Sequence, residues 1–169
     1  GSDGVALSYR GRVLFAFVGE DQGAHRSGSP GPMTEAVRAA ASMTDIVRNM
    51  GQGYSIAVMD MEGHETGKRS ARVTMDFRLP LGTEESDIEL ILNETAASFG
   101  LTAEVIEYVP PYGVHKADPV IRAFRNAIRE TGNTPRVLAK QGTCDLNVLS
   151  PWGCHMGAFG PGDSKYDHT

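Results

Sequence analysis

Residues 69–79, Arg-Ser-Ala-Arg-Val-Thr-Met-Asp-Phe-Arg-Leu, alternate polar and apolar side chains over most of their length. A period of two is typical of a β-strand with one buried face. Residues 54–61 also alternate or run apolar, and the polar residues 62–67 separate the two segments. The sequence therefore predicts a β-hairpin of residues 54–61 and 69–79.

Helical patterns flank this hairpin on both sides. Before it, apolar residues recur at helical spacing up to Gly51, at positions Val37, Ala40, Met43, Val47 and Met50. After it, Thr83 is expected to cap a helix whose first turn is acidic. The apolar face of that second helix comprises Ile88, Ile91, Leu92, Ala96 and Phe99.

Two further strands complete the first domain. The apolar run 13–18 follows the turn signal Arg10-Gly11, which predicts a hairpin or a bent strand, and residues 101–109 form a strand that ends at Pro110-Pro111. The order βαββαβ predicts an α+β lid domain over residues 1–110, with two helices on one face of an antiparallel sheet.

Residues 111–169 change in character. Asp118-Pro119 is expected to cap a helix that carries Val120, Ile121, Phe124 and Ile128, and residues 136–139 and 156–159 are expected to be short buried strands. Alternating helix and strand predict an α/β fragment as the second domain.

Composition excludes several classes of partner. Sixteen Lys and Arg against 21 Asp and Glu give a net charge of -5, so the chain does not attract nucleic acid or anionic membranes as a whole. No apolar run is long enough to span a bilayer, and two cysteines give neither a disulfide framework nor a zinc finger. We expect a cytoplasmic protein.

Polar residues concentrate in 140–147 and 160–168, each directly after a predicted strand. The turn Gly142-Thr143-Cys144-Asp145 offers backbone N–H groups and a hydroxyl, which suit a carboxylate or a developing oxyanion. An ordinary turn is equally compatible with this composition.

Together, Lys-x-Gly-Thr-x-Asp-x-Asn (140–147), Pro-Trp-Gly-Cys (151–154) and Gly-Pro-Gly-Asp-Ser-x-x-Asp-His-Thr (160–169) resemble the di-zinc aminoacylase/carboxypeptidase family. Tyr-Arg-Gly-Arg (9–12), His25 and Met-Asp-Phe-Arg-Leu-Pro (75–80) extend the resemblance to the family's lid domain. Members that release lysine or ornithine from an amino-group carrier protein are the most similar, and acetylornithine deacetylase and succinyl-diaminopimelate desuccinylase are the alternatives.

The resemblance implies a role for five residues. His168 matches the last metal ligand, and His25 matches the lid histidine that stabilises the oxyanion in the partner's active site. Arg78 and the Gly142-Thr143 turn match positions that hold the substrate α-carboxylate. Without the resemblance, each of these residues also fits a solvated or turn position.

The resemblance also implies two zinc ions per active site, with cobalt as an alternative, and a homodimer formed through the lid. This chain contains one of the matching metal ligands and no His-x-Asp pair, and Glu20-Asp21 is interpreted as a polar pair at a strand end. We therefore expect part of a hydrolase that lacks the N-terminal catalytic half, and a chain that alone binds no zinc tightly and is inactive.

The remaining histidines, His64, His115 and His155, are expected to be solvated or structural. A non-catalytic dimerisation or ligand-binding module remains open as an alternative. An RNA-binding βαββαβ domain is disfavoured, because residues 72–78 contain one aromatic and no glycine.

Overall fold

The computed structural model describes residues 4–23, 30–64 and 67–160, and these form two compact units. Residues Arg12–Tyr108 form the lid unit. The described residues of Gly1–Gly11 and Val109–Thr169 form the C-terminal unit. The sequence predicts one domain over residues 1–110, whereas the first strand groups with the C-terminal unit because its pairing partners come from that part of the chain.

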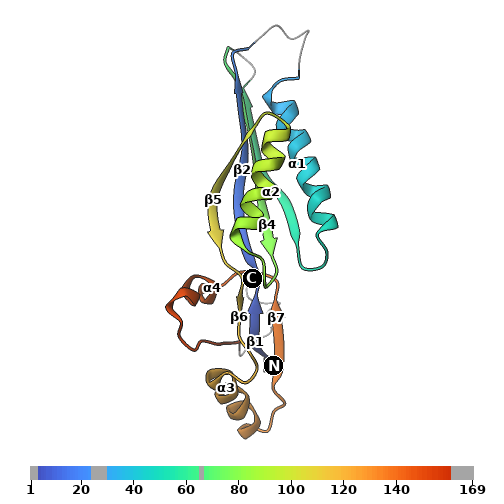
Figure 1. Ribbon diagram of the computed structural model, residues 1–169. Coiled ribbons are helices and arrows are strands. Elements are labelled where there is room, and N and C mark those ends of the chain that lie inside the picture. Colours follow the sequence, from blue (N-terminus) through green and yellow to red (C-terminus); the bar gives the residue numbers. More distant parts are fainter. Residues whose placement is uncertain (1–3, 24–29, 65–66, 161–169) are drawn as a thin grey trace. The chain divides into compact units, whose positions relative to one another are not determined.

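The lid unit contains a four-stranded sheet in the order β3-β4-β2-β5 (Figure 1). Its strands are β2 (Gly11–Asp21), β3 (Ser55–His64), β4 (Arg69–Leu79) and β5 (Thr102–Val109). Antiparallel pairing from Ser55↔Arg78 to His64↔Ser70 confirms the predicted β3–β4 hairpin, and a bulge lies between Val58 and Asp60.

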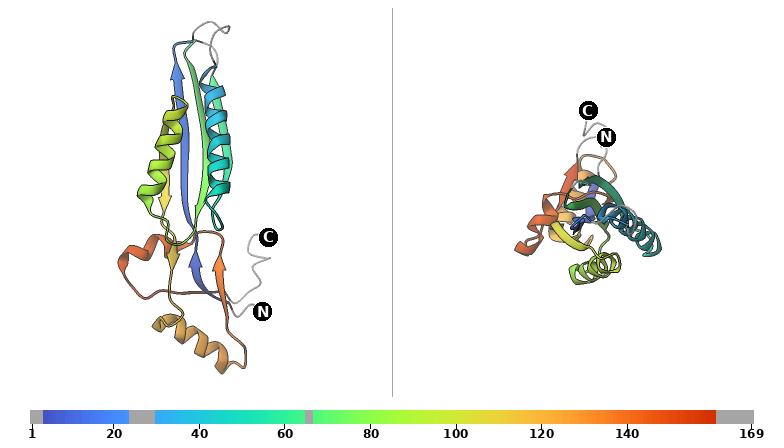
Figure 2. Two further views of the ribbon diagram at one scale, coloured as in Figure 1. Left: turned by 45° about the vertical axis from the view of Figure 1, so that its right-hand side comes forward. Right: turned by 90° about the horizontal axis from the view of Figure 1, so that it is seen from above.

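Two helices, α1 (Pro32–Asn49) and α2 (Glu85–Ser98), cover one face of this sheet (Figure 2). The core between them takes alternate residues of the central strands, Val13, Phe15 and Phe17 of β2 and Val73, Met75, Phe77 and Leu79 of β4. Met43 of α1 and Leu92 of α2 pack into the same core. The predicted α+β class is confirmed.

Two details of the helices differ from the prediction. Val37 is 44% exposed, because the buried face of α1 instead follows Ala36, Ala39, Ala40, Met43 and Val47. Thr83 does not cap α2, whose N-cap residue is Glu84; the Thr83 hydroxyl donates a hydrogen bond to the Pro80 carbonyl.

The C-terminal unit is built around β1 (Gly4–Tyr9), which pairs in parallel with β7 (Arg136–Lys140) and antiparallel with β6 (Tyr112–Gly113) and β8 (Ala158–Gly160). β1 and β2 therefore lie in different sheets, so of the two forms predicted for the N-terminal element, a hairpin or a bent strand, the hairpin is wrong. Helix α3 (Pro119–Glu130) packs Ile121 and Ile128 against Val5. Asp118 caps α3 as predicted, by accepting from the Val120 N–H at 2.9 Å.

The strands predicted as buried in this unit are in fact partly open. Val137 of β7 is 52% exposed and Phe159 of β8 is 38% exposed. Among the described residues β7 pairs with β1 alone, so one edge and much of its surface have no neighbouring strand. The unit also contains α4 (Asp145–Leu149) and a 3-10 turn at Ser150–Trp152. No helix in the described part of the chain is both long and apolar enough to cross a membrane.

Candidate functional site

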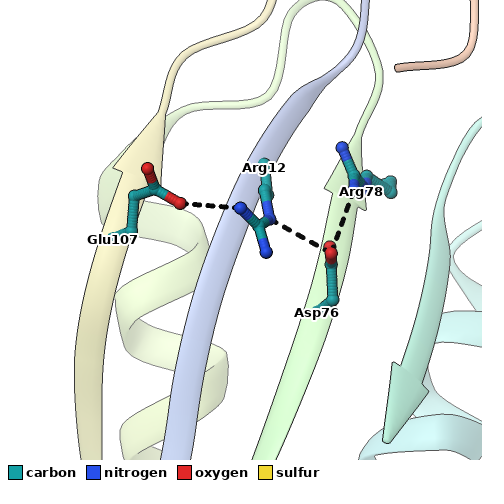
Figure 3. Close-up of polar contacts among 4 residues, drawn as sticks. All are labelled: Arg12, Asp76, Arg78 and Glu107. Carbon is teal, nitrogen blue, oxygen red and sulfur yellow. Dashed lines mark hydrogen bonds and ion pairs between the residues drawn. The ribbon is translucent and has the colours of Figure 1, made fainter. Parts of the chain in front are cut away.

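Arg78 lies at the end of β4, where its guanidinium is held by a carboxylate on its own strand. Its Nη2 donates to Asp76 Oδ2 at 2.9 Å, and the same oxygen accepts from Arg12 Nε of β2 at 3.1 Å. Arg12 Nη1 also donates to Glu107 of β5 at 2.8 Å, so Arg12 lies between two carboxylates (Figure 3). Three strands thus contribute to one ion-pair network on the sheet face opposite Phe77 and the helices.

The network leaves part of Arg78 available to a ligand. The Asp76 side chain is 9% exposed, whereas the Arg78 side chain is 29% exposed. One bond to Asp76 restricts the guanidinium orientation, and its other N–H groups can meet a carboxylate in the bidentate geometry typical of arginine. The second Asp76 oxygen, Oδ1, is buried without a hydrogen-bond partner among the described residues.

The second predicted group, the Gly142-Thr143 turn, follows β7 and precedes α4. Gly142 is exposed and Thr143 is half-buried. The next residue, Cys144, donates its backbone N–H to Asn147 Oδ1 at 2.8 Å, and the Asn147 N–H lies 3.0 Å from the Cys144 carbonyl. These reciprocal bonds hold the turn in place at the end of the strand.

Tyr9 of β1 packs beside this turn. Burial raises the pKa of Tyr9 to about 12, and the charge of the Cys144 thiol group and a side-chain hydrogen bond with it add to the effect. Tyr9 is therefore a neutral hydroxyl over the whole physiological range.

The two predicted histidines, His25 and His168, lie outside the described residues. Arg78 belongs to the lid unit, and the Gly142-Thr143 turn belongs to the C-terminal unit. Within the described residues, no three His, Cys, Asp or Glu side chains are grouped so that they could hold a metal ion.

The acidic pair at the end of β2 has basic partners. Glu20 pairs with Lys68, and Asp21 accepts from Arg69 Nε at 2.8 Å. The hydrogen bond from Arg69, together with one from the Gly23 N–H, lowers the pKa of Asp21. A carboxylate held ionised by its neighbours is a poor general base, which agrees with the interpretation of this pair as structural.

His155 is 67% exposed at its side chain, and its Nδ1 lies 2.6 Å from Asp118 Oδ2. Burial acts to raise the pKa of Asp118, but hydrogen bonds from His155 and from the Val120 N–H outweigh it and lower that pKa. His155 therefore supports the start of α3, in line with a structural role. His64 and His115 are exposed.

Sequence reasoning missed the residues that support the predicted site. The motifs that contain Asp76 and Asn147 predict no role for either residue, but both are buried polar residues in the structure. A buried polar group needs partners, and their partners lie up to 137 positions away in the sequence. Local pattern contains no signal for such distant pairing.

Searches with protein-family models found no match. The whole chain is 30% identical to a protein of Thermococcus kodakarensis named as a LysW-lysine/LysW-ornithine hydrolase, and it covers 46% of that protein. A LysW-lysine hydrolase of Deinococcus radiodurans is 28% identical over 98% of the chain, which covers 49% of that enzyme. The chain thus spans about half the length of the curated relatives it matches.

Solved structures show the same fold. The dipeptidase Dug1p of Saccharomyces cerevisiae matches 97% of the chain with a TM-score of 0.72 and 9% identity, and 50% of Dug1p is covered. A tripeptidase of Staphylococcus aureus matches 94% of the chain with a TM-score of 0.69 and 13% identity, and 45% of it is covered. The chain is thus similar along its whole length to about half of a LysW-lysine/LysW-ornithine hydrolase and shares the fold of these two peptidases, which agrees with the predicted resemblance to the aminoacylase/carboxypeptidase family.

Proposed function

We propose that the chain is the lid unit and the C-terminal catalytic part of an amide hydrolase that releases lysine or ornithine from an amino-group carrier protein. The observation that carries this proposal is the similarity of the entire chain to LysW-lysine/LysW-ornithine hydrolases. In this chain the partly exposed Arg78 guanidinium, held by Asp76, supports it. Acetylornithine deacetylase and succinyl-diaminopimelate desuccinylase are sibling alternatives that differ in the acyl group.

In this proposal Arg78 and the Gly142-Thr143 turn bind the α-carboxylate of the amino-acid portion. Arg78 contributes a planar guanidinium that can donate two parallel hydrogen bonds to a carboxylate, and Thr143 contributes a hydroxyl beside backbone N–H groups. Orienting the substrate through its carboxylate places the scissile amide at a fixed distance, which lowers the entropic part of the barrier. His25 of a partner subunit donates a hydrogen bond to the developing oxyanion.

Two zinc ions are proposed to supply the activated water in the whole enzyme, held mainly by ligands outside the described residues. The isolated chain is proposed to be inactive and to bind no zinc tightly. Calorimetric titration of the isolated chain checks this directly, because tight binding of two zinc ions per chain, or amidase activity, contradicts it.

The activity is tested on the whole protein with carrier-linked lysine, N-acetyl-ornithine and succinyl-diaminopimelate. Carrier-linked lysine is expected to have the highest kcat/KM, and a preference for either of the other two substrates refutes the assignment. The substitution His25→Ala is expected to lower kcat by about 10²–10³-fold. His64→Ala, at an exposed histidine of the lid unit, is the matched control and leaves kcat unchanged.

The substitution Arg78→Lys tests the proposed carboxylate contact, because lysine keeps the positive charge but cannot donate two parallel hydrogen bonds. KM for the carboxylate substrate is expected to rise by roughly 10–100-fold. Arg48→Lys is the control, since Arg48 is 74% exposed and pairs with Asp45 on the surface of α1. Equal KM values for Arg78→Lys and Arg48→Lys would refute a role of Arg78 in binding the carboxylate.

We also propose that the lid unit forms a homodimer through β3 and α1. β3 is an edge strand that exposes Val58, Met59 and Met61, and Val37 is exposed on the neighbouring helix. Exposed apolar side chains on a strand at the edge of a sheet favour association with a second sheet. Sedimentation is expected to show a dimer that Met59→Glu dissociates, whereas Leu90→Glu, at an equally exposed position on α2, does not; a strict monomer refutes it.

A further inference from the structure

Asn147 has no part in the function proposed above, yet it is completely buried and its side chain is fully engaged. Its Oδ1 accepts the Cys144 N–H at 2.8 Å. Its Nδ2 donates to two backbone carbonyls, those of Arg10 at 3.1 Å and Pro110 at 2.8 Å. Three side-chain bonds from a short, buried amide fix its position with little freedom.

The two carbonyls that Asn147 binds lie where the chain passes between the compact units. One passage follows Gly11 and the other precedes Val109, so residues 10–11 and 109–111 are the two links on the C-terminal side. The links run close together, because a Cβ atom on Gly11 would lie 2.6 Å from Pro111 N and 2.7 Å from Val109 O. Pro110 and Pro111 have no N–H to donate from their link. Asn147 Nδ2 donates to one carbonyl of each link.

The other end of the Asn147 side chain belongs to the proposed substrate-binding turn. Cys144, whose N–H it accepts, directly follows Thr143. The Asn147 carbonyl in turn accepts from Ser150 Oγ at 2.8 Å, which holds α4 behind the turn. A continuous set of hydrogen bonds therefore runs from the turn through one amide to both links.

We propose that Asn147 is a positioning residue that fastens the Gly142-Thr143 turn to both chain links, so that the substrate-binding turn and the two links keep one geometry within the C-terminal unit. The proposal rests on the substrate-binding role proposed for Thr143. It assigns the final asparagine of the Lys-x-Gly-Thr-x-Asp-x-Asn motif to the backbone links, and leaves it no free polar atom for substrate.

Hydrogen exchange on the 169-residue chain tests the anchor without reference to activity. Asn147→Asp keeps the oxygen that accepts from Cys144 but loses both donors, so amides of residues 9–12 and 112–113 are expected to exchange at least tenfold faster while the Cys144 amide changes less than threefold. Asn147→Ala removes the acceptor as well as the donors, so hydrogen exchange is expected to accelerate both at the link amides and at the Cys144 amide. Asn126→Asp makes the same change at an exposed amide of α3 and leaves both sets unchanged. If the link amides exchange at the same rate in Asn147→Asp as in Asn126→Asp, the proposal is overturned.

A measurement on the unmodified chain keeps the proposal testable if the variants do not fold. Scalar couplings across the hydrogen bonds are expected from the Asn147 side-chain nitrogen to the Arg10 and Pro110 carbonyl carbons. Its two side-chain amide hydrogens are expected to exchange at least 100-fold more slowly than those of Asn126. Rapid exchange of the Asn147 amide hydrogens overturns the anchor.

In the whole enzyme, Asn147→Asp is expected to raise KM at least tenfold with less than a threefold change in kcat, because the turn that binds the carboxylate loses its support. Unchanged KM overturns the positioning role. A wild-type protein without amidase activity instead refutes the proposed function, and the exchange results then decide the anchor alone.

Discussion

The substitution Asp76→Ala removes the carboxylate that connects Arg12 and Arg78 in the lid unit. Asp76 Oδ2 accepts from both guanidinium groups, at 3.1 and 2.9 Å, from a side chain that is 9% exposed. A hydrogen bond to a charged group contributes about 1.5–3 kcal/mol. Because the Arg12 and Arg78 side chains are 26% and 29% exposed, water replaces part of each bond, and the expected loss is about 2–3 kcal/mol in the free energy of unfolding.

Thermal unfolding of the 169-residue chain measures this loss. For a chain of this size 1 kcal/mol corresponds to about 2–4 °C, so Tm is expected to fall by about 4–12 °C. Asp45→Ala is the matched control, because Asp45 is 69% exposed and pairs with Arg48 on the surface of α1. An exposed pair of this kind contributes about 0–1 kcal/mol, so its Tm changes little.

A second readout separates stability from orientation. In the whole enzyme, Asp76→Ala frees the Arg78 guanidinium, and KM for the carboxylate substrate is expected to rise about tenfold at a temperature where the variant is folded. A Tm decrease no larger than that of Asp45→Ala refutes the energetic argument. An unchanged KM refutes the idea that Asp76 orients Arg78.

Three further predictions concern other parts of the chain. Gly11→Ala is expected to lower the free energy of unfolding by about 1–3 kcal/mol in urea titrations, because its Cβ atom meets the backbone of Pro111; wild-type stability would show that the links can separate freely. The pKa of Tyr9 is raised from 10.0 to about 12, so the folded chain keeps a proton that the unfolded chain releases, and stability is expected to fall as pH rises from 10 through 12. Tyr9→Phe should flatten that fall in alkaline unfolding curves, and an equally steep fall in the variant contradicts the assignment. Met43→Ala, at a fully buried core position, is expected to cost about 2–5 kcal/mol by the same titration, whereas a cost below 1 kcal/mol would mean that the core collapses around the cavity.

Local periodicity predicted most of the elements of the fold. The alternation in residues 69–79 corresponds to β4, and the helical spacing around Met43 corresponds to α1. Asp118-Pro119 marked the start of α3 because an N-cap bond is local, spanning two residues. Patterns of this kind depend on residues that are close together in the sequence, so they can be interpreted without the tertiary structure.

The exposure of β7 and the true buried face of α1 were not predictable in the same way. An apolar run such as residues 136–139 indicates a strand but does not show how many neighbours that strand has. Val37 lies at a helical interval from Met43, yet the rotation of α1 against the sheet buries Ala36 instead. Packing geometry, rather than hydrophobicity alone, decided both.

The sequence by itself determined the order of strands and helices in the lid, the α+β class and the motif around Thr143, because each depends on residues close together in the chain. Only the tertiary structure decided that β1 pairs with β7, that Asp76 holds Arg12 and Arg78, and that Asn147 binds Arg10 and Pro110. Most of these contacts join residues 37–137 positions apart. They form because buried polar groups and unpaired strand edges must find partners, and the fold alone determines which partners are near.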